Sequence, residues 1–174
     1  HAASGIGVYY FCRVRLDSRR AAFLAGIAYV LCFYHTQQIL MMGRHPVGLV
    51  YALLPLPFVF TELSLKARSW HRHAVVGGMC HAALVFTHPG YGLYATGFLV
   101  LYVGLRSFEK DDHTVLFQGL AVTFAGLVLS APHTIPMLAE RSSTGLSLGW
   151  TLGGVDGPSL QHLLSWSNYR FWLF

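Results

Sequence analysis

The stretch that decides the fold is HAVVGGMCHAALVFTHPGYGLYATGFLVLYVGL, residues 73–105, which contains no Asp, Glu, Lys or Arg over 33 residues. A helix on the surface of a soluble protein needs a polar face, and a charge-free run of this length provides none. Three further charge-free runs cover residues 21–43, 45–61 and 113–139. These runs predict helices that cross a lipid bilayer.

The composition of the whole chain agrees with this prediction. Of its 174 residues, 54% are hydrophobic and 11% are charged, whereas soluble domains carry about 25% charged residues. The formal net charge of +5 comes mostly from arginine clusters that flank the apolar runs, as the positive-inside rule describes. Composition therefore excludes an ordinary soluble domain, a disordered chain and a nucleic-acid-binding module.

We predict an all-α fold, a polytopic transmembrane bundle of about five spans plus the end of a sixth, from a window of about 20 residues. The expected helices cover residues 21–36, 46–64, 73–88, 91–107 and 114–131. The tail of a further helix ends near Cys12. We expect an internal fragment of a longer protein, with a transmembrane domain over residues 1–131 and an irregular, partial extracytoplasmic segment over 132–174.

The basic residues of the loops predict the orientation of this bundle. Loops 13–20, 65–72 and 106–113 are rich in Arg and Lys, whereas loop 37–45 carries one basic residue and the turn 88–91 carries none. The positive-inside rule then places the three basic loops on the cytoplasmic side of the cytoplasmic membrane. We expect the arginine clusters of that side to be solvated, with little that resembles a site.

Three of the expected helices are short for a membrane span. Residues 21–36, 73–88 and 91–107 would reach about 24 to 26 Å as helices, against a hydrocarbon core of about 30 Å. Because the chain reverses at His88–Gly92, we expect a polar depression at the outer face. A thinner bilayer, or helices that extend a few residues further, is the alternative.

Proline and glycine positions add two expectations about the helices. Pro55 and Pro57 lie in the middle of the 46–64 helix, which we therefore expect to be kinked or interrupted, as are many helices that flank a cavity. Glycines within the runs are expected to let helices pack closely; these are Gly77, Gly78, Gly97, Gly104, Gly119 and Gly126.

Candidate site residues gather at the expected outer ends. Arg44 precedes Pro46, a residue that favours helix starts, so its guanidinium would lie beside helix N–H groups in an anion site suited to phosphate. The alternative for Arg44 is a side chain that reaches the lipid headgroups. The other candidate substrate-binding residues are His35, Gln38, His45, His88, His133 and Arg141.

The candidate catalytic residue is Glu140, since group transfer uses a carboxylate as general base; a loop salt bridge with Arg141 is the alternative. His81 and His88 are seven residues apart, but no recurring pair of histidines predicts a haem site. The cysteines show no zinc spacing. No cofactor or metal site is evident in the sequence, and a divalent metal in the full-length protein stays open.

Several short motifs resemble those of a known family. The runs Arg19–Tyr29, Gly43–Pro46, Ala52–Leu56 and Ala83–Pro89, with Tyr34-His35 between the first two, resemble multi-pass C-fold membrane glycosyltransferases. They are most similar to the membrane proteins labelled 6-pyruvoyl-tetrahydropterin-synthase-related. The resemblance implies transfer of a sugar from a polyprenyl-phosphate donor at the outer membrane face. It also implies a catalytic acid upstream of His1, with Arg44 near the donor phosphate.

Two other functions remain open from the sequence. A multi-pass transporter or flippase fits the proline-interrupted and glycine-rich helices, and a non-catalytic membrane assembly subunit needs no site. The expected partners are the lipid bilayer and, if the resemblance holds, a polyprenyl-linked sugar, but no nucleic acid. The sequence identifies neither the sugar, the acceptor nor the oligomeric state.

Overall fold

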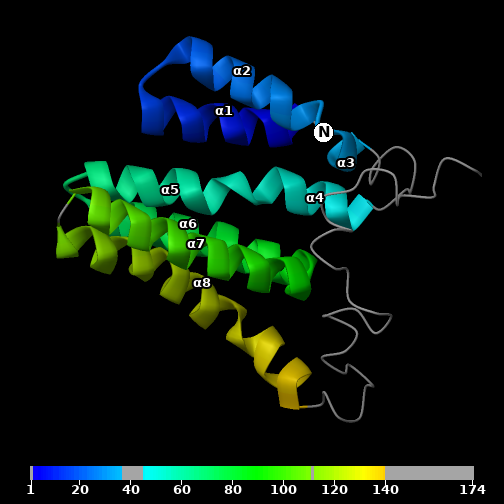
Figure 1. The fold of residues 1–174 in the computed structure, drawn as a ribbon. Helices are drawn as coiled ribbons and strands as arrows, with labels where there is room; N and C mark the ends of the chain where they lie inside the picture. The colour runs from blue at the N-terminus through cyan, green and yellow to red at the C-terminus, as the bar shows by residue number, and fades with distance from the viewer. Residues whose placement is uncertain (1, 37–44, 111, 140–174) are drawn as a thin grey trace, which may run out of the picture. The chain divides into compact units, whose positions relative to one another are not determined.

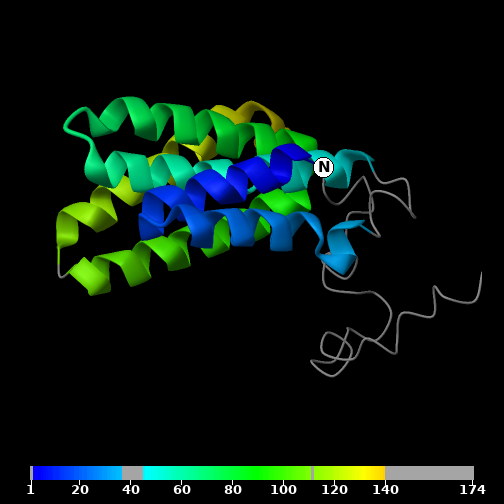
Figure 2. The same cartoon turned by 90° about the horizontal axis from the view of Figure 1, so that it is seen from above.

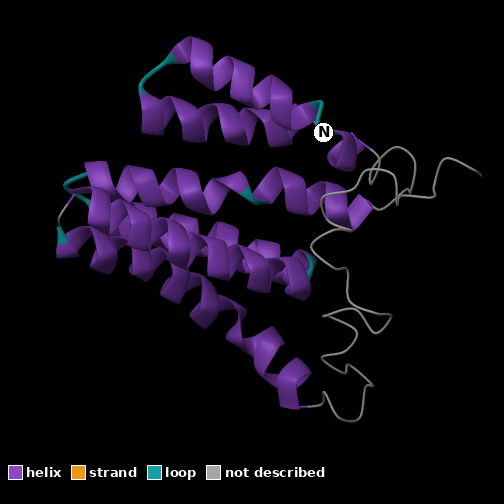
Figure 3. Cartoon of the chain, in the orientation of Figure 1, coloured by secondary structure: helices purple, strands orange, loops and turns teal. Residues whose placement is uncertain are grey.

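The computed structural model describes residues 2–36, 45–110 and 112–139, and all of their regular structure is helical (Figures 1 and 3). The helices are α1 (Ala2–Leu16), α2 (Arg19–Val30), α3 (Phe33–Thr36), α4 (His45–Leu53), α5 (Pro55–Lys66), α6 (Trp70–Thr87), α7 (Pro89–Lys110) and α8 (His113–Ala139). No strand occurs among the described residues. The all-α fold class is therefore confirmed.

Contacts divide the chain into two units, residues 1–134 and 135–174. The first unit holds the packed helices, and of the second the structure describes only the end of α8. Within the first unit, α1 packs against α2 and α5, α5 against α6, and α6 against α7. Figures 1 and 2 both show the α1–α2, α5–α6 and α7–α8 connections on the same side of the unit.

Each expected helix is present, but several of the expected bounds differ from those in the structure. The first expected span ends at Val30 instead of residue 36, and the short α3 follows it. The irregular segment expected from residue 132 is wrong at its start, because α8 continues through Pro132 and Pro136 to Ala139. Each proline removes one backbone donor of the helix, and the Thr134 hydroxyl between them donates to the Ser130 carbonyl at 2.9 Å.

The lengths of α6 and α7 change the argument for a sunken outer face. α6 has 18 residues and α7 has 22, so they extend about 27 and 33 Å. The expectation that α7 falls short of the bilayer core is therefore wrong. Pro89 begins α7 directly after the turn, as its fixed φ allows. The tight reversal itself is confirmed, since His88 alone separates the two helices.

Two segments of the described chain are long and apolar enough to cross a membrane: Pro46–Lys66 and His113–Ala139. The first is interrupted where its prolines predict, because α4 ends at Leu53 and α5 begins at Pro55 (Figure 1). Pro55 and Pro57 are both buried. α1 approaches here, and a Cβ built on Gly7 would lie 3.1 Å from the Pro55 ring.

The glycines fall into two groups. A Cβ built on Gly78 would lie 2.5 Å from Ala125 Cβ, and one on Gly126 would lie 2.7 Å from His81, so these glycines let α6 and α8 pack closely. The same expectation is wrong for Gly97 and Gly104, where a Cβ would meet nothing within 4 Å. Both lie on a face of α7 that other described residues do not cover.

Polarity within the first unit is distributed in the opposite way to a soluble protein. Large apolar side chains are exposed along most helices, among them Phe98, Phe117 and Phe124 at 64%, 66% and 69%. Glu62 and His81, in contrast, are fully buried. Small apolar clusters such as Val50, Leu84 and Ala95 fill the rest of the interior.

Candidate functional site

The candidate residues taken from the sequence are only partly placed by the structure. Four of them lie outside the described residues: Gln38, Arg44, Glu140 and Arg141. His35 lies in α3 and His45 begins α4, and the structure describes only their backbones. The side chains of His88 and His133 are described, and both are exposed.

The structure brings His88 and His133 to the same end of α6. His88 links α6 to α7, and its Nδ1 accepts a hydrogen bond from the backbone N–H of Tyr91 at 3.4 Å. The His133 ring, on α8, lies 5.5 Å from the ring of Phe86, two residues before His88. Of the expected outer-end group, these two histidines are therefore shown to lie at the same end of the first unit.

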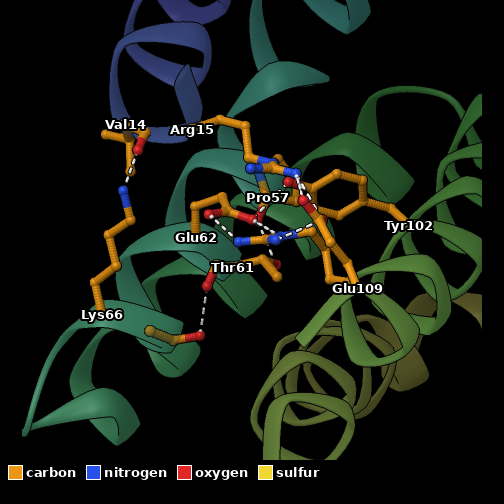
Figure 4. A network of polar contacts seen from close by, with 10 residues as sticks. Val14, Arg15, Pro57, Thr61, Glu62, Lys66, Tyr102 and Glu109 are labelled. Carbon is orange, nitrogen blue, oxygen red and sulfur yellow. Dashed lines mark hydrogen bonds and ion pairs between the residues drawn. The ribbon is translucent and has the colours of Figure 1, made fainter. Parts of the chain in front are cut away.

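The most extensive polar site was not expected from the sequence, and it lies at the other end of the bundle (Figure 4). The Glu62 carboxylate on α5 is completely buried and forms an ion pair with Arg106 on α7, whose side chain is 7% exposed. Arg106 Nε donates to Glu62 Oε1 at 2.6 Å, and its terminal nitrogen donates to Oε2 at 3.1 Å. The Tyr102 hydroxyl also donates to Oε1, at 2.6 Å.

A second acid and a second arginine extend this network to α1. Arg106 also donates to Glu109 Oε2 at 2.6 Å, and Arg15 on α1 donates to both Glu109 oxygens at 2.7 and 2.6 Å. The hydrogen bonds from Arg15, followed by that from Arg106, lower the pKa of Glu109. Two carboxylates and two guanidinium groups therefore balance in charge and tie α1, α5 and α7 together.

The expectation that this end holds only solvated arginines is therefore wrong for Arg15 and Arg106. The sequence does contain a signal for the ion pair: Glu62 and Arg106 are the first charged residues after the charge-free runs 45–61 and 73–105. Because α5 and α7 run in the same direction, these positions reach the same depth. Ionisable groups at membrane depth usually pair with one another in the bundle interior.

A second buried polar group joins α6, α7 and α8. The Thr96 hydroxyl donates its single proton to the Gly92 carbonyl at 2.9 Å, so it accepts from His81 Nε2, which lies 2.9 Å away. His81 Nδ1 is then an acceptor, and it has no hydrogen-bond partner among the described residues. It lies against Gly126. This arrangement holds His81 in one neutral tautomer at a close helix contact.

The described part of the chain holds no cluster of three or more His, Cys, Asp or Glu side chains suited to a metal ion. No family model matches the sequence, and comparisons with curated proteins and with solved structures gave no significant match. The residues themselves therefore define the class: an all-helical protein with two described segments of membrane-spanning length and composition.

Proposed function

We propose that the chain is the multi-pass helical part of a cytoplasmic-membrane protein, with loops 13–20, 65–72 and 106–113 on the cytoplasmic side. The observation that carries this proposal is the distribution of polarity, with Glu62 and Arg106 inside and large apolar side chains outside. Soluble monomers rarely expose such extended apolar surfaces, whereas lipid chains cover them without penalty. Charges within a membrane bundle face its interior in pairs, as these two do.

Reporter fusions to the full-length protein test this topology. A fusion after Arg68 is expected to give a fluorescent cytoplasmic reporter and inactive alkaline phosphatase, because the α5–α6 loop is basic. A fusion after Gly90, at the α6–α7 turn, should give the reverse. Active phosphatase after Arg68, or inactive phosphatase after Gly90, would refute the proposed orientation.

We also propose, from the resemblance, that the whole protein transfers a sugar from a polyprenyl-phosphate donor at the outer membrane face. Its support within the described residues is that His88 and His133 are both exposed at the end opposite the basic loops. Imidazole N–H groups donate hydrogen bonds to phosphate and sugar oxygens. Arg44, which lies outside the described residues, is the residue proposed from the sequence to bind the donor phosphate.

Transfer from a radiolabelled lipid-linked sugar, measured in membranes that contain the full-length protein, tests this activity. Arg44→Ala and His88→Ala are expected to lower the rate about tenfold or more, the effect of one hydrogen bond to a charged group. The matched control is His71→Ala, an exposed histidine at the other end of the same helix. Equal rates in all variants would refute the assigned roles, and sugar uptake without covalent transfer would favour a transporter.

A further inference from the structure

The basic end of the first unit is built from the ends of several helices. Lys66 at the end of α5 donates a hydrogen bond to the Val14 carbonyl near the end of α1. Arg15 reaches Glu109 at the end of α7. These contacts bring the α1–α2 and α5–α6 connections together on one side, where Figures 1 and 2 both show them.

The basic side chains of this end divide into two groups. Those that pack in the bundle have partners: Arg13 pairs with Asp17, Arg15 with Glu109, and Arg106 with Glu62 and Glu109. The side chains of four other arginines are exposed and form no hydrogen bond or ion pair with any described residue; these are Arg19, Arg20, Arg68 and Arg72. Asp17, the acid nearest to Arg19 in the sequence, is already occupied by Arg13. Four positive charges therefore remain without a partner in the described chain.

The unpaired arginines lie next to apolar side chains that are also exposed. On α2, Arg19 and Arg20 are followed by Phe23 and Leu24, which are 60% and 66% exposed. On α6, Arg72 is followed by the exposed Val75. A guanidinium one turn beyond a lipid-facing apolar side chain lies at the depth of the headgroups.

We infer that Arg19, Arg20, Arg68 and Arg72 bind the headgroups of anionic phospholipids, an inference that rests on the proposed membrane location. A guanidinium matches the phosphate group with two parallel hydrogen bonds. Basic residues near an anionic membrane surface strengthen binding by about fivefold each. The site is selective because neutral phospholipids carry no net charge to offset the four unpaired arginines.

Trp70 provides a local probe of this site, because it lies two residues from both Arg68 and Arg72 and packs on Phe117. The full chain is prepared with Trp150, Trp166 and Trp172 replaced by Phe, so that Trp70 is the single fluorophore. It is reconstituted in phosphatidylcholine vesicles that contain either brominated phosphatidylglycerol or brominated phosphatidylcholine. The ratio of quenching by the two brominated lipids gives their relative binding constant beside Trp70.

We expect brominated phosphatidylglycerol to be favoured over brominated phosphatidylcholine. The Arg68→Ala/Arg72→Ala variant should lower this preference about 25-fold at most, since each arginine contributes about fivefold. The Arg68→Lys/Arg72→Lys variant retains both charges and should keep most of the preference. Helix content by circular dichroism, and quenching by brominated phosphatidylcholine, verify that each variant is folded and inserted.

The outcomes separate this inference from the membrane proposal. Equal quenching by the two lipids in the parent chain, or a preference that the alanine variant retains, would overturn the headgroup site and leave membrane insertion supported. Absence of quenching by either lipid would show that Trp70 is not near lipid and would overturn the headgroup site; if the chain also fails to float with the vesicles in a density gradient, the membrane proposal is overturned as well.

Discussion

Removing Arg106 is expected to destabilise the bundle by about 3–5 kcal/mol, the effect of leaving one member of a buried ion pair without its partner. Glu62 is fully buried, and Arg106 is the cation that pairs with it in the structure. In the Arg106→Ala variant, Glu62 keeps only the Tyr102 hydroxyl as a donor from this network. A lone buried carboxylate with one neutral hydrogen bond is strongly unfavourable.

Removing Glu62 instead of Arg106 should destabilise the bundle less, and this asymmetry follows from the geometry. In Glu62→Ala, Arg106 still has Glu109 at 2.6 Å, so its charge remains paired. The loss should then be about 1.5–3 kcal/mol, that of a hydrogen bond to a charged group. In the double variant no uncompensated carboxylate remains at position 62, so Glu62→Ala should restore stability to the Arg106→Ala protein.

Unfolding by sodium dodecyl sulfate in mixed micelles, followed by circular dichroism, measures all three variants and completes a double-mutant cycle. The expected order of stability places Glu62→Ala above Arg106→Ala, with the double variant more stable than Arg106→Ala alone. Two results would refute the argument from burial: Arg106→Ala loses no more unfolding free energy than Glu62→Ala, or the losses of the two single variants add up to that of the double variant. In either case Glu62 does not depend on Arg106.

Three further predictions follow from the described contacts. Glu109 has a lowered pKa because it accepts hydrogen bonds from Arg15 and Arg106. Its stabilising effect is therefore complete above the ordinary glutamate pKa and is lost as pH falls through the lowered pKa. A Glu109→Gln variant whose stability depends on pH in the same way as that of the parent would contradict this. The Asp112 carboxylate accepts from the Thr114 N–H at 2.8 Å and caps α8, so Asp112→Ala should lower the detergent concentration at the midpoint of unfolding, whereas Asp112→Asn should retain most of the stability. Gly126→Ala places a methyl group 2.7 Å from His81 and should destabilise by about 1–3 kcal/mol. Its control, Gly97→Ala, meets open space and should stabilise the helix by about 0.5–1 kcal/mol; equal effects of the two changes would refute the assigned α6–α8 contact.

The features that the sequence predicted well depend on residues close together in the chain. Pro55 removes a backbone donor whatever surrounds it, and the span breaks next to it, at Leu54. His88-Pro89-Gly90 holds the reversal between α6 and α7, because Pro89 favours a helix start and disfavours a helical conformation at His88 before it, which is extended. Helix existence followed from the apolar runs, although the end of α8 was missed, since the helix continues past residue 131 to Ala139.

The features that were missed depend on how each helix is rotated about its axis. Gly97 and Gly126 look alike in the sequence, but Gly97 faces open space and Gly126 faces His81. Glu62 and Arg106 are separated by 44 residues, and their contact requires both side chains to point into the same space. Apolar runs without a polar face contain little information on how a helix is rotated about its axis. The few polar residues within or next to these runs therefore carry most of that information.

That dependence explains why the ion pair between Glu62 and Arg106 was not predicted. A charge at the end of an apolar run has two physical outcomes: it reaches the headgroups, or it turns inward to an opposite charge. The outward outcome needs only one residue, as we infer for Arg72, but the inward one needs a partner at equal depth on a neighbouring helix. Glu62 and Arg106 meet that condition because α5 and α7 run in parallel and each ends its apolar run at the basic end. Pairs of opposite charge that end parallel spans on the same side are therefore the positions to inspect first when a bundle of this kind is read from sequence.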